Sequence, residues 1–164
     1  MSEIETMQTV QYLTFKLEEE LFALGITQVR EVLEFDQVTK VPQTPDIMRG
    51  VINLRGSVVP VIDLKLKFGM GITEKSINTC VIMVELEIDG EMTLIGALAD
   101  SVQEVIDLEP GQIEPPPKIG THLNTDLIKG IGKREEQFII ILEIEKVFTS
   151  DELVAIQDTA EEEG

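Results

Sequence analysis

The sequence predicts an all-β protein made of two related subdomains, and three observations point to that class. Short runs rich in Val, Ile, Leu and Phe alternate with turn residues along most of the chain. Helix signals are few, and one part of the chain repeats another at a fixed distance. Turns between short strands favour barrels or a sandwich. Two repeated units favour two small barrels packed together with a cleft between them.

The first strands are expected where apolar and polar residues alternate. Residues 11–17 place Leu13, Phe15 and Leu17 on one face, and a second strand is expected over 21–26 after three successive glutamates. Residues 28–33 are expected to form a turn or two of helix.

Two hairpins are expected from their turn residues. Residues 79–88 and 91–98 flank Asp89-Gly90, a dipeptide that readily supplies the positive φ angles of a two-residue turn. Residues 51–54 and 58–62 flank a turn at 55–57. Pro60 has no N–H for a ladder, so its strand is expected at an edge or with a bulge.

The last elements are an apolar strand over 138–144 and a short helix over 150–157. Thr149 and Glu152 have the spacing of a capping box, and Phe148 could pack onto Leu153 as a hydrophobic staple. The acidic residues 158–164 are expected to form a flexible tail.

The repeat relates residues 46–51 to 126–131 at a shift of 80, and 61–64 to 141–144 at the same shift. Residues 29–32 resemble 102–105 at a shift of 73. We expect a single domain over 10–157 with two intertwined subdomains, roughly 10–75 and 76–148, between which strands can be exchanged.

The repeat isolates Arg55, because Arg55 and Gly56 at one hairpin tip correspond to Glu135 and Glu136 at the other. The fold therefore gives no evident packing reason for an arginine there. Two interpretations stay open: an ordinary solvated charge, or a fixed cation that meets a carboxylate on a partner.

Charge and composition exclude several classes of function. The 164 residues carry 13 Lys and Arg against 31 Asp and Glu, a net charge of −18. Such a chain repels phosphate backbones, so nucleic acid and anionic membranes are poor partners. The acidic start does not resemble a signal peptide, and the apolar runs are too short to span a bilayer, so we expect no membrane insertion and a cytoplasmic location.

Catalytic motifs are lacking. The one cysteine, Cys80, lies in a strand pattern where a buried thiol is expected, and the one histidine, His122, follows a proline-rich stretch. No metal site or cofactor is expected. A small hydrolase or thiol enzyme that uses Cys80 and His122, and calcium binding by the acidic surface, remain as rival hypotheses.

The paired segments around Val29, Glu31, Val102 and Val105, the hairpin tips and the expected inter-barrel groove suit docking to other proteins. Simple core packing is the alternative for these valines.

The sequence resembles the CheW family of bacterial chemotaxis coupling proteins from about residue 11 to 156. The resemblance rests on Val41-Pro42-Gln43-Thr44-Pro45, on Gly50-Val51-Ile52-Asn53-Leu54-Arg55-Gly56-Ser57-Val58-Val59-Pro60, on Val29-Arg30-Glu31-Val32 and, more loosely, on Leu127-Ile128-Lys129-Gly130-Ile131-Gly132.

The resemblance implies two five-stranded, SH3-like β-barrels around a shared hydrophobic core. It also implies a non-catalytic scaffold that links methyl-accepting chemotaxis receptors, through their cytoplasmic signalling tips, to the regulatory domain of the CheA histidine kinase. Recruitment to receptor arrays at the inner face of the membrane would follow. The matching partner-contact positions are Val29, Glu31, Gly50, Arg55, Gly56 and Val105.

Overall fold

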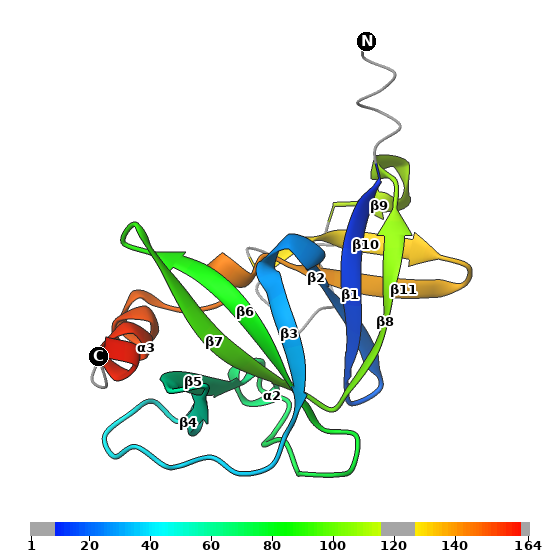
Figure 1. The fold of residues 1–164 in the computed structure, drawn as a ribbon. Helices are drawn as coiled ribbons and strands as arrows, with labels where there is room; N and C mark the ends of the chain where they lie inside the picture. The colour runs from blue at the N-terminus through cyan, green and yellow to red at the C-terminus, as the bar shows by residue number, and fades with distance from the viewer. Residues whose placement is uncertain (1–8, 116–126, 162–164) are drawn as a thin grey trace.

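The computed structural model describes residues 9–115 and 127–161, which form two strongly twisted sheets with few helices (Figure 1). Sheet A has the strand order β8-β1-β2-β11-β10-β9, and sheet B has the order β3-β6-β7-β5-β4. The strands of sheet A are β1 (Val10–Leu17), β2 (Glu20–Gly25), β8 (Ser101–Leu108), β9 (Ile113–Glu114), β10 (Ile128–Arg134) and β11 (Gln137–Leu142). Those of sheet B are β3 (Val29–Glu34), β4 (Met48–Leu54), β5 (Ser57–Asp63), β6 (Cys80–Ile88) and β7 (Glu91–Ala99).

Short helical segments connect the strands. They are α2 (Leu64–Lys67), α3 (Ser150–Glu161) and the 3₁₀ turns η1 (Ile26–Gln28), η2 (Pro110–Gln112) and η4 (Ile144–Lys146). The predicted all-β class with a C-terminal helix is confirmed. Sheet A has a sixth strand, because the two residues of β9 pair with β10.

Both expected hairpins form, with two-residue turns. Asp89 and Gly90 have φ angles of 52° and 82°, and Arg55 and Gly56 have 52° and 90°. These positive φ values match the right-handed twist of the flanking strands. Arg55 adopts this conformation without being a glycine, and Glu135 does the same at the tip of the β10–β11 hairpin.

The helical turn expected over residues 28–33 is wrong, because Val29–Glu34 is strand β3. The β3–β6 ladder changes register between Val29 and Glu31, so Arg30 is an extra residue in the strand. This bulge interrupts the two-residue period and leaves apolar residues at 29, 32 and 33, a spacing that resembles one face of a helix.

The expectation for Pro60 is also corrected. Strand β5 is not at an edge, since it lies between β4 and β7, and the irregularity in its ladder is on β4, between Met48 and Gly50. Pro60 is tolerated because the parallel ladder with β7 begins one residue later, at Val61.

Helix α3 begins with the predicted capping box. The Thr149 N–H donates to Glu152 Oε1 at 2.9 Å, and the Glu152 N–H donates to Thr149 Oγ1 at 3.1 Å. The helix packs against β5 and β7 and continues to Glu161, so residues 158–161 of the expected flexible tail are helical. Thr159 is buried and its hydroxyl donates to the Ala155 carbonyl.

The internal repeat is present in three dimensions. The order β3-β6-β7-β5-β4 matches β8-β1-β2-β11-β10, with the same sequence of antiparallel, antiparallel, parallel and antiparallel pairings. Even the irregularities correspond: the register shift beside Arg49 in β4 recurs beside Lys129 in β10. Each sheet takes strands from both sides of residue 75, so the boundary expected there does not separate the two sheets. This mixing of strands is what the expected strand exchange between subdomains would produce.

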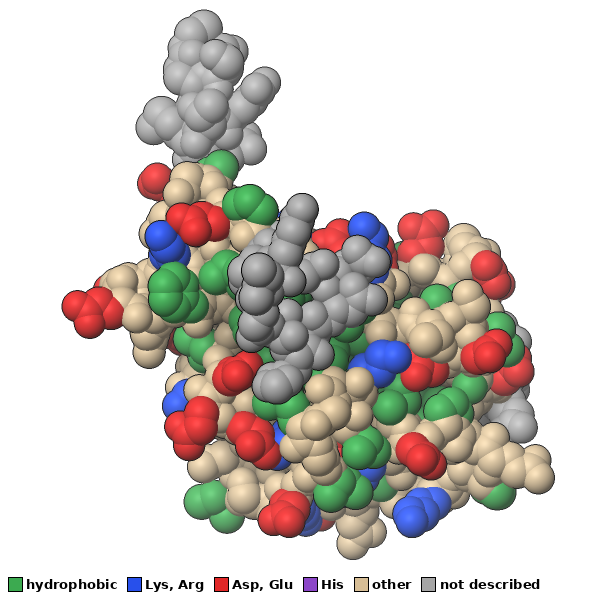
Figure 2. Space-filling model, turned by 180° about the vertical axis from the view of Figure 1, so that it is seen from behind, with side chains coloured by type: hydrophobic (Ala, Val, Ile, Leu, Met, Phe, Trp, Pro, Cys, Tyr) green, Lys and Arg blue, Asp and Glu red, His purple; other side chains and the backbone are tan. Residues whose placement is uncertain are grey.

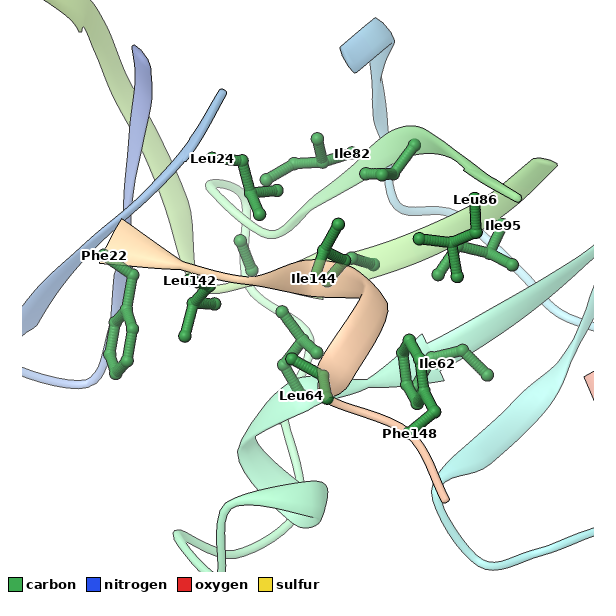
Figure 3. Packing of buried hydrophobic residues seen from close by; sticks show 14 of the residues in the cluster. Phe22, Leu24, Ile62, Leu64, Ile82, Leu86, Ile95, Leu142, Ile144 and Phe148 are labelled. Atoms are coloured by element: carbon green, nitrogen blue, oxygen red, sulfur yellow. The ribbon is translucent and has the colours of Figure 1, made fainter. Parts of the chain in front are cut away.

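Each sheet curls around a small apolar cluster of its own, and we call the curled sheets barrel A and barrel B. Barrel A encloses a cluster that includes Tyr12 and Ile139, and barrel B encloses one that includes Met83 and Val59. The largest cluster lies between the barrels and draws on both of them, together with the segments that follow β5 and β11 (Figure 3). Its labelled members are Phe22, Leu24, Ile62, Leu64, Ile82, Leu86, Ile95, Leu142, Ile144 and Phe148.

Asp63 is a fully buried hydrogen-bond acceptor at the end of β5. Its carboxylate accepts from the Arg49 guanidinium at 3.0 Å, from the Thr73 N–H at 2.9 Å and hydroxyl at 2.6 Å, and from the Leu66 N–H at 3.3 Å. The Arg49 guanidinium also lies over the Phe35 ring. Asp63 therefore ties β4, helix α2 and the following loop together.

Asp63→Ala should destabilise the protein by about 3–5 kcal/mol, because it leaves the Arg49 charge and several donors without their acceptor. Urea denaturation measures the change. Asp107→Ala is the control, since Asp107 is an exposed residue of β8, and it should change the free energy of unfolding by less than about 0.5 kcal/mol. A cost at Asp63 equal to that at Asp107 would contradict the role given to Asp63.

Lys65 joins the two barrels at the turn between β1 and β2. Its ammonium, with the side chain only 8% exposed, lies 2.9 Å from Glu18 Oε2 and 3.3 Å from Asp100 Oδ2. The Glu18 N–H donates to the same Asp100 oxygen at 2.7 Å. Burial alone would lower the pKa of Lys65, but the hydrogen bonds and charges of Glu18 and Asp100 outweigh it and raise the pKa above the ordinary 10.5.

This raised pKa predicts a loss of stability in alkali. The folded chain holds the Lys65 proton more tightly than the unfolded chain, so the contribution is complete below pH 10.5 and is lost as the pH rises through the folded-state pKa. Denaturation of wild type and Lys65→Met at pH 8 to 12 should show a difference in the free energy of unfolding that shrinks above pH 10.5. A difference that stays constant over this range would show that the charge of Lys65 is not what stabilises the turn.

Candidate partner-docking site

The two charged residues among the expected partner-contact positions bind each other. Glu31 lies on β3 and Arg55 at the tip of the β4–β5 hairpin, and the Arg55 guanidinium donates to Glu31 Oε2 in an ion pair. The Arg55 side chain is 70% exposed and that of Glu31 is 32% exposed. Arg55 is therefore not the isolated tip cation that the repeat suggested, and the tip carries both signs of charge.

The local sequence holds the tip in shape. Asn53 Oδ1 accepts a hydrogen bond of 2.9 Å from the Gly56 N–H across the turn. Gly56 has a φ of 90° and no atom near the position of a Cβ, so its role is conformational rather than a matter of space. The Asn-Leu-Arg-Gly sequence thus fixes the backbone conformation of the turn and, with it, the position of the Arg55 Cα.

A corresponding ion pair exists in barrel A, and it was not among the predicted contact residues. Arg134 at the end of β10 lies 3.0 Å from Glu104 Oε2 on β8. Glu104 is the repeat counterpart of Glu31, but Arg134 corresponds to Leu54 rather than to Arg55. The comparison of Arg55 with Glu135 made the second tip look purely acidic, whereas the cation stands one position earlier in the chain.

Each ion pair starts from an outermost strand of its sheet and reaches a segment near the other end of the same sheet. In sheet B, β3 and β4 are the outermost strands, and Glu31 and Arg55 connect them. In sheet A, β8 is an outermost strand, and Glu104 connects it to Arg134 on β10. The pairs therefore lie where each barrel closes.

The other expected contact residues lie at varying distances from this tip. Val29 is on β3 with Glu31, half-buried against the core between the barrels. Val105 is half-exposed on β8, in sheet A, and does not belong to the Glu31–Arg55 cluster. Val29 and Val105 do each lie on an outermost strand of a sheet, which leaves part of the backbone of these strands available for contact.

Gly50 acts through its backbone. Its φ is 151°, and a Cβ built there would lie 2.5 Å from the carbonyl oxygen of Thr39. Thr39 and Val51 exchange two backbone hydrogen bonds of 2.9 and 2.8 Å, which hold the segment before β4 against the edge of the sheet. In barrel A the same close approach occurs between Gly130 and Glu114 of β9.

The structure gives little support to the rival hypotheses. Cys80 is half-buried at the start of β6, rather than buried as expected, and its thiol lies 3.2 Å from the Asn78 carbonyl. His122 lies outside the described residues. Over residues 9–115 and 127–161, no group of three or more His, Cys, Asp or Glu is placed to hold a metal ion. Carboxylates are scattered over the face in Figure 2, with basic groups among them.

Comparisons with known proteins place this architecture in one class. The family model of the CheW-like domain matches residues 11–152. The chain therefore belongs to the CheW-like family, whose fold is the pair of barrels described above.

Curated and solved relatives are similar over most of the chain. The chain is 35% identical to the chemotaxis protein CheW of Klebsiella aerogenes over 150 residues, 92% of this chain and 88% of that one. The crystal structure of the scaffolding protein TtCheW from Thermoanaerobacter tengcongensis matches with a TM-score of 0.77 and 39% identity, over 88% of this chain and 91% of that one. The protein is thus a non-catalytic chemotaxis scaffold that couples receptors to CheA.

Part of a CheA protein is also similar. The chemotaxis protein CheA of Bacillus subtilis is 38% identical over 79 residues, which are 48% of this chain and 11% of CheA. Among the described residues, no helix has the length and apolar character needed to cross a membrane.

Gly50→Ala should cost about 2 kcal/mol or more, because the added Cβ meets the Thr39 carbonyl and Gly50 has a φ that other residues rarely adopt. Gly111→Ala is the matched control, since nothing lies within 4 Å of its Cβ position and its φ is ordinary. Thermal unfolding of both variants tests this, and equal midpoints for the two would show that the approach to Thr39 is not tight.

Proposed function

We propose that the tip of barrel B, defined as Glu31, Arg55 and Gly56, docks onto the regulatory domain of CheA. The Glu31–Arg55 pair carries the proposal, since it brings together two residues 24 positions apart and leaves the arginine mostly exposed. The similarity of a CheA segment to half of this chain supports a barrel-to-barrel contact, in which two like surfaces meet.

The Glu31–Arg55 ion pair costs little to break, so each residue can take a new ion-pair partner on a docking protein. An exposed ion pair contributes only about 0–1 kcal/mol to stability, so a docking partner can break it at little cost. The Arg55 guanidinium presents several donors in a plane, which favours a carboxylate on the partner, while Glu31 becomes free to accept from a partner cation. Such an exchange of ion pairs sets the register of the complex.

Val29 and Val105 are the residues we assign to the receptor. They lie on β3 and β8, and an apolar face of a receptor's cytoplasmic helical tip could pack on such strands. In this proposal the protein is cytoplasmic and joins receptor arrays at the inner face of the membrane. A receptor's conformational change shifts the activity of the kinase because the scaffold's contacts differ between the two states.

Reversal of either charge should weaken binding of the CheA regulatory domain. Glu31→Arg and Arg55→Glu each place like charges together and should weaken binding about tenfold or more, as titration calorimetry would measure. Arg30→Glu is the matched control, because Arg30 lies next to Glu31 on β3 but pairs with Glu85 of β6, in a comparably exposed ion pair that does not involve Arg55.

The thermal midpoints of these variants should stay within a few degrees of wild type, because the pair is exposed. A loss of binding with Arg30→Glu as large as with Arg55→Glu would place the contact elsewhere on β3. Unchanged binding in both tip variants would reject the assignment.

A further inference from the structure

Arg55 occupies a backbone position that suits other residues better. Both residues of the β4–β5 turn have positive φ angles, 52° at Arg55 and 90° at Gly56, and the Asp89-Gly90 turn has nearly the same pair, 52° and 82°. Aspartate, asparagine and glycine reach this left-handed region more readily than other residues. The β4–β5 turn therefore carries, at its first position, a residue that its own conformation disfavours.

The matching hairpin tip of barrel A has a different turn. Glu135 has a φ of 57°, but Glu136, the counterpart of Gly56, is not among the described residues with positive φ. The repeat therefore does not by itself require two left-handed residues at this tip. Of the two matching tips, the one with two positive φ angles is the one that carries Arg55.

Asn53 supplies the hydrogen bond that holds the β4–β5 turn. Its Oδ1 accepts from the Gly56 N–H at 2.9 Å. In the β6–β7 turn the corresponding residue is Glu87, and no such bond across the turn occurs there among the described residues. In barrel A the corresponding residue is Lys133, whose ammonium lies 2.9 Å from a carboxylate oxygen of β9 instead. The bond thus accompanies the turn whose first residue is the arginine.

Asn53 is a poor residue for its place in the sheet. It is exposed near the end of β4, opposite Val58 of β5. Asparagine is depleted from strands, where a β-branched residue such as valine fits better. The turn, rather than the sheet, accounts for an asparagine at this position.

We propose that Asn53 is a positioning residue for the docking of CheA, and that it acts through Arg55 rather than by touching the partner. The bond to Gly56 keeps the turn in the conformation from which the Arg55 guanidinium reaches Glu31. A tip that is already formed loses less conformational freedom when the partner binds. This inference rests on the docking proposed above.

Asn53→Val removes the acceptor and leaves a residue that fits the strand. Binding of the CheA regulatory domain, measured by titration calorimetry, should weaken about twofold to tenfold, the range of one net hydrogen bond. The thermal midpoint should stay within about 3 °C of wild type, because the better strand propensity offsets the lost bond. Amide NMR should show faster solvent exchange at Gly56. Asn53→Asp keeps an acceptor at the same place and should restore both binding and amide protection.

A double variant tests whether Asn53 acts through Arg55. In an Arg55→Ala background, Asn53→Val should weaken binding no further, because no guanidinium is left to position. Lys133→Val makes the same kind of change at the counterpart position in barrel A, and it should bind the CheA domain like wild type.

The outcomes separate this inference from the docking on which it rests. If Arg55→Ala binds like wild type, the docking proposal fails and the inference fails with it. If Arg55→Ala weakens binding but Asn53→Val does not, or if the Gly56 amide is unchanged in Asn53→Val, the inference alone is overturned. Losses that add in the double variant also overturn it, since Asn53 would then contact the partner. A midpoint that falls together with binding, without rescue by Asn53→Asp, would make Asn53 a purely structural residue.

Discussion

The core between the barrels is the constraint on which the rest of this structure depends. Phe22 and Leu24 reach it from sheet A, Ile82 and Ile95 reach it from sheet B, and all four are fully buried. Neither sheet can bury this face alone, so the two barrels stabilise one another. The strands are also exchanged in sequence, because β3 to β7 of sheet B lie between the first two and last four strands of sheet A. The position of one barrel therefore fixes that of the other, as a scaffold requires.

The two copies of the repeat differ in where they place an arginine. In each barrel a glutamate on an outermost strand pairs with an arginine near the other end of the sheet, but the arginine comes from different repeat positions, Arg55 in one and Arg134 in the other. In barrel B the arginine lies beyond the strand, at an exposed tip, and the interior is filled by Met83 and Leu54. In barrel A the arginine stands at the repeat position of that leucine, and the interior is packed with buried residues such as Tyr12 and Ile139. A shift of one residue thus separates an arginine at an exposed hairpin tip from one at the end of a strand.

The sequence predicted those parts of the fold that depend on neighbouring residues. The Asp89-Gly90 and Arg55-Gly56 turns and the Thr149–Glu152 capping box follow from local chemistry, and all three form. The extra residue in β3 was not predictable in the same way, because a bulge is set by pairing with β6 and leaves an apolar spacing that imitates a helix.

The candidate site was predicted residue by residue but not as an arrangement. The resemblance named Arg55 and Glu31 as two separate contact positions. Their pairing depends on closure of the barrel between β3 and the β4–β5 hairpin. The match of Glu104 to Glu31 was visible in the repeat, as was the position of Arg134 beside Glu135. The register of β10 was needed to show that Arg134 and Glu104 meet.

The most direct test of the central claim is to map the surface of this protein that changes when the CheA regulatory domain binds. Backbone amide NMR shifts, recorded with and without that domain, would be compared along the chain. The account predicts that the largest changes fall on β3 near Glu31 and on the β4–β5 turn at Arg55 and Gly56. Changes confined to helix α3 or to barrel A, with the turn unaffected, would contradict it.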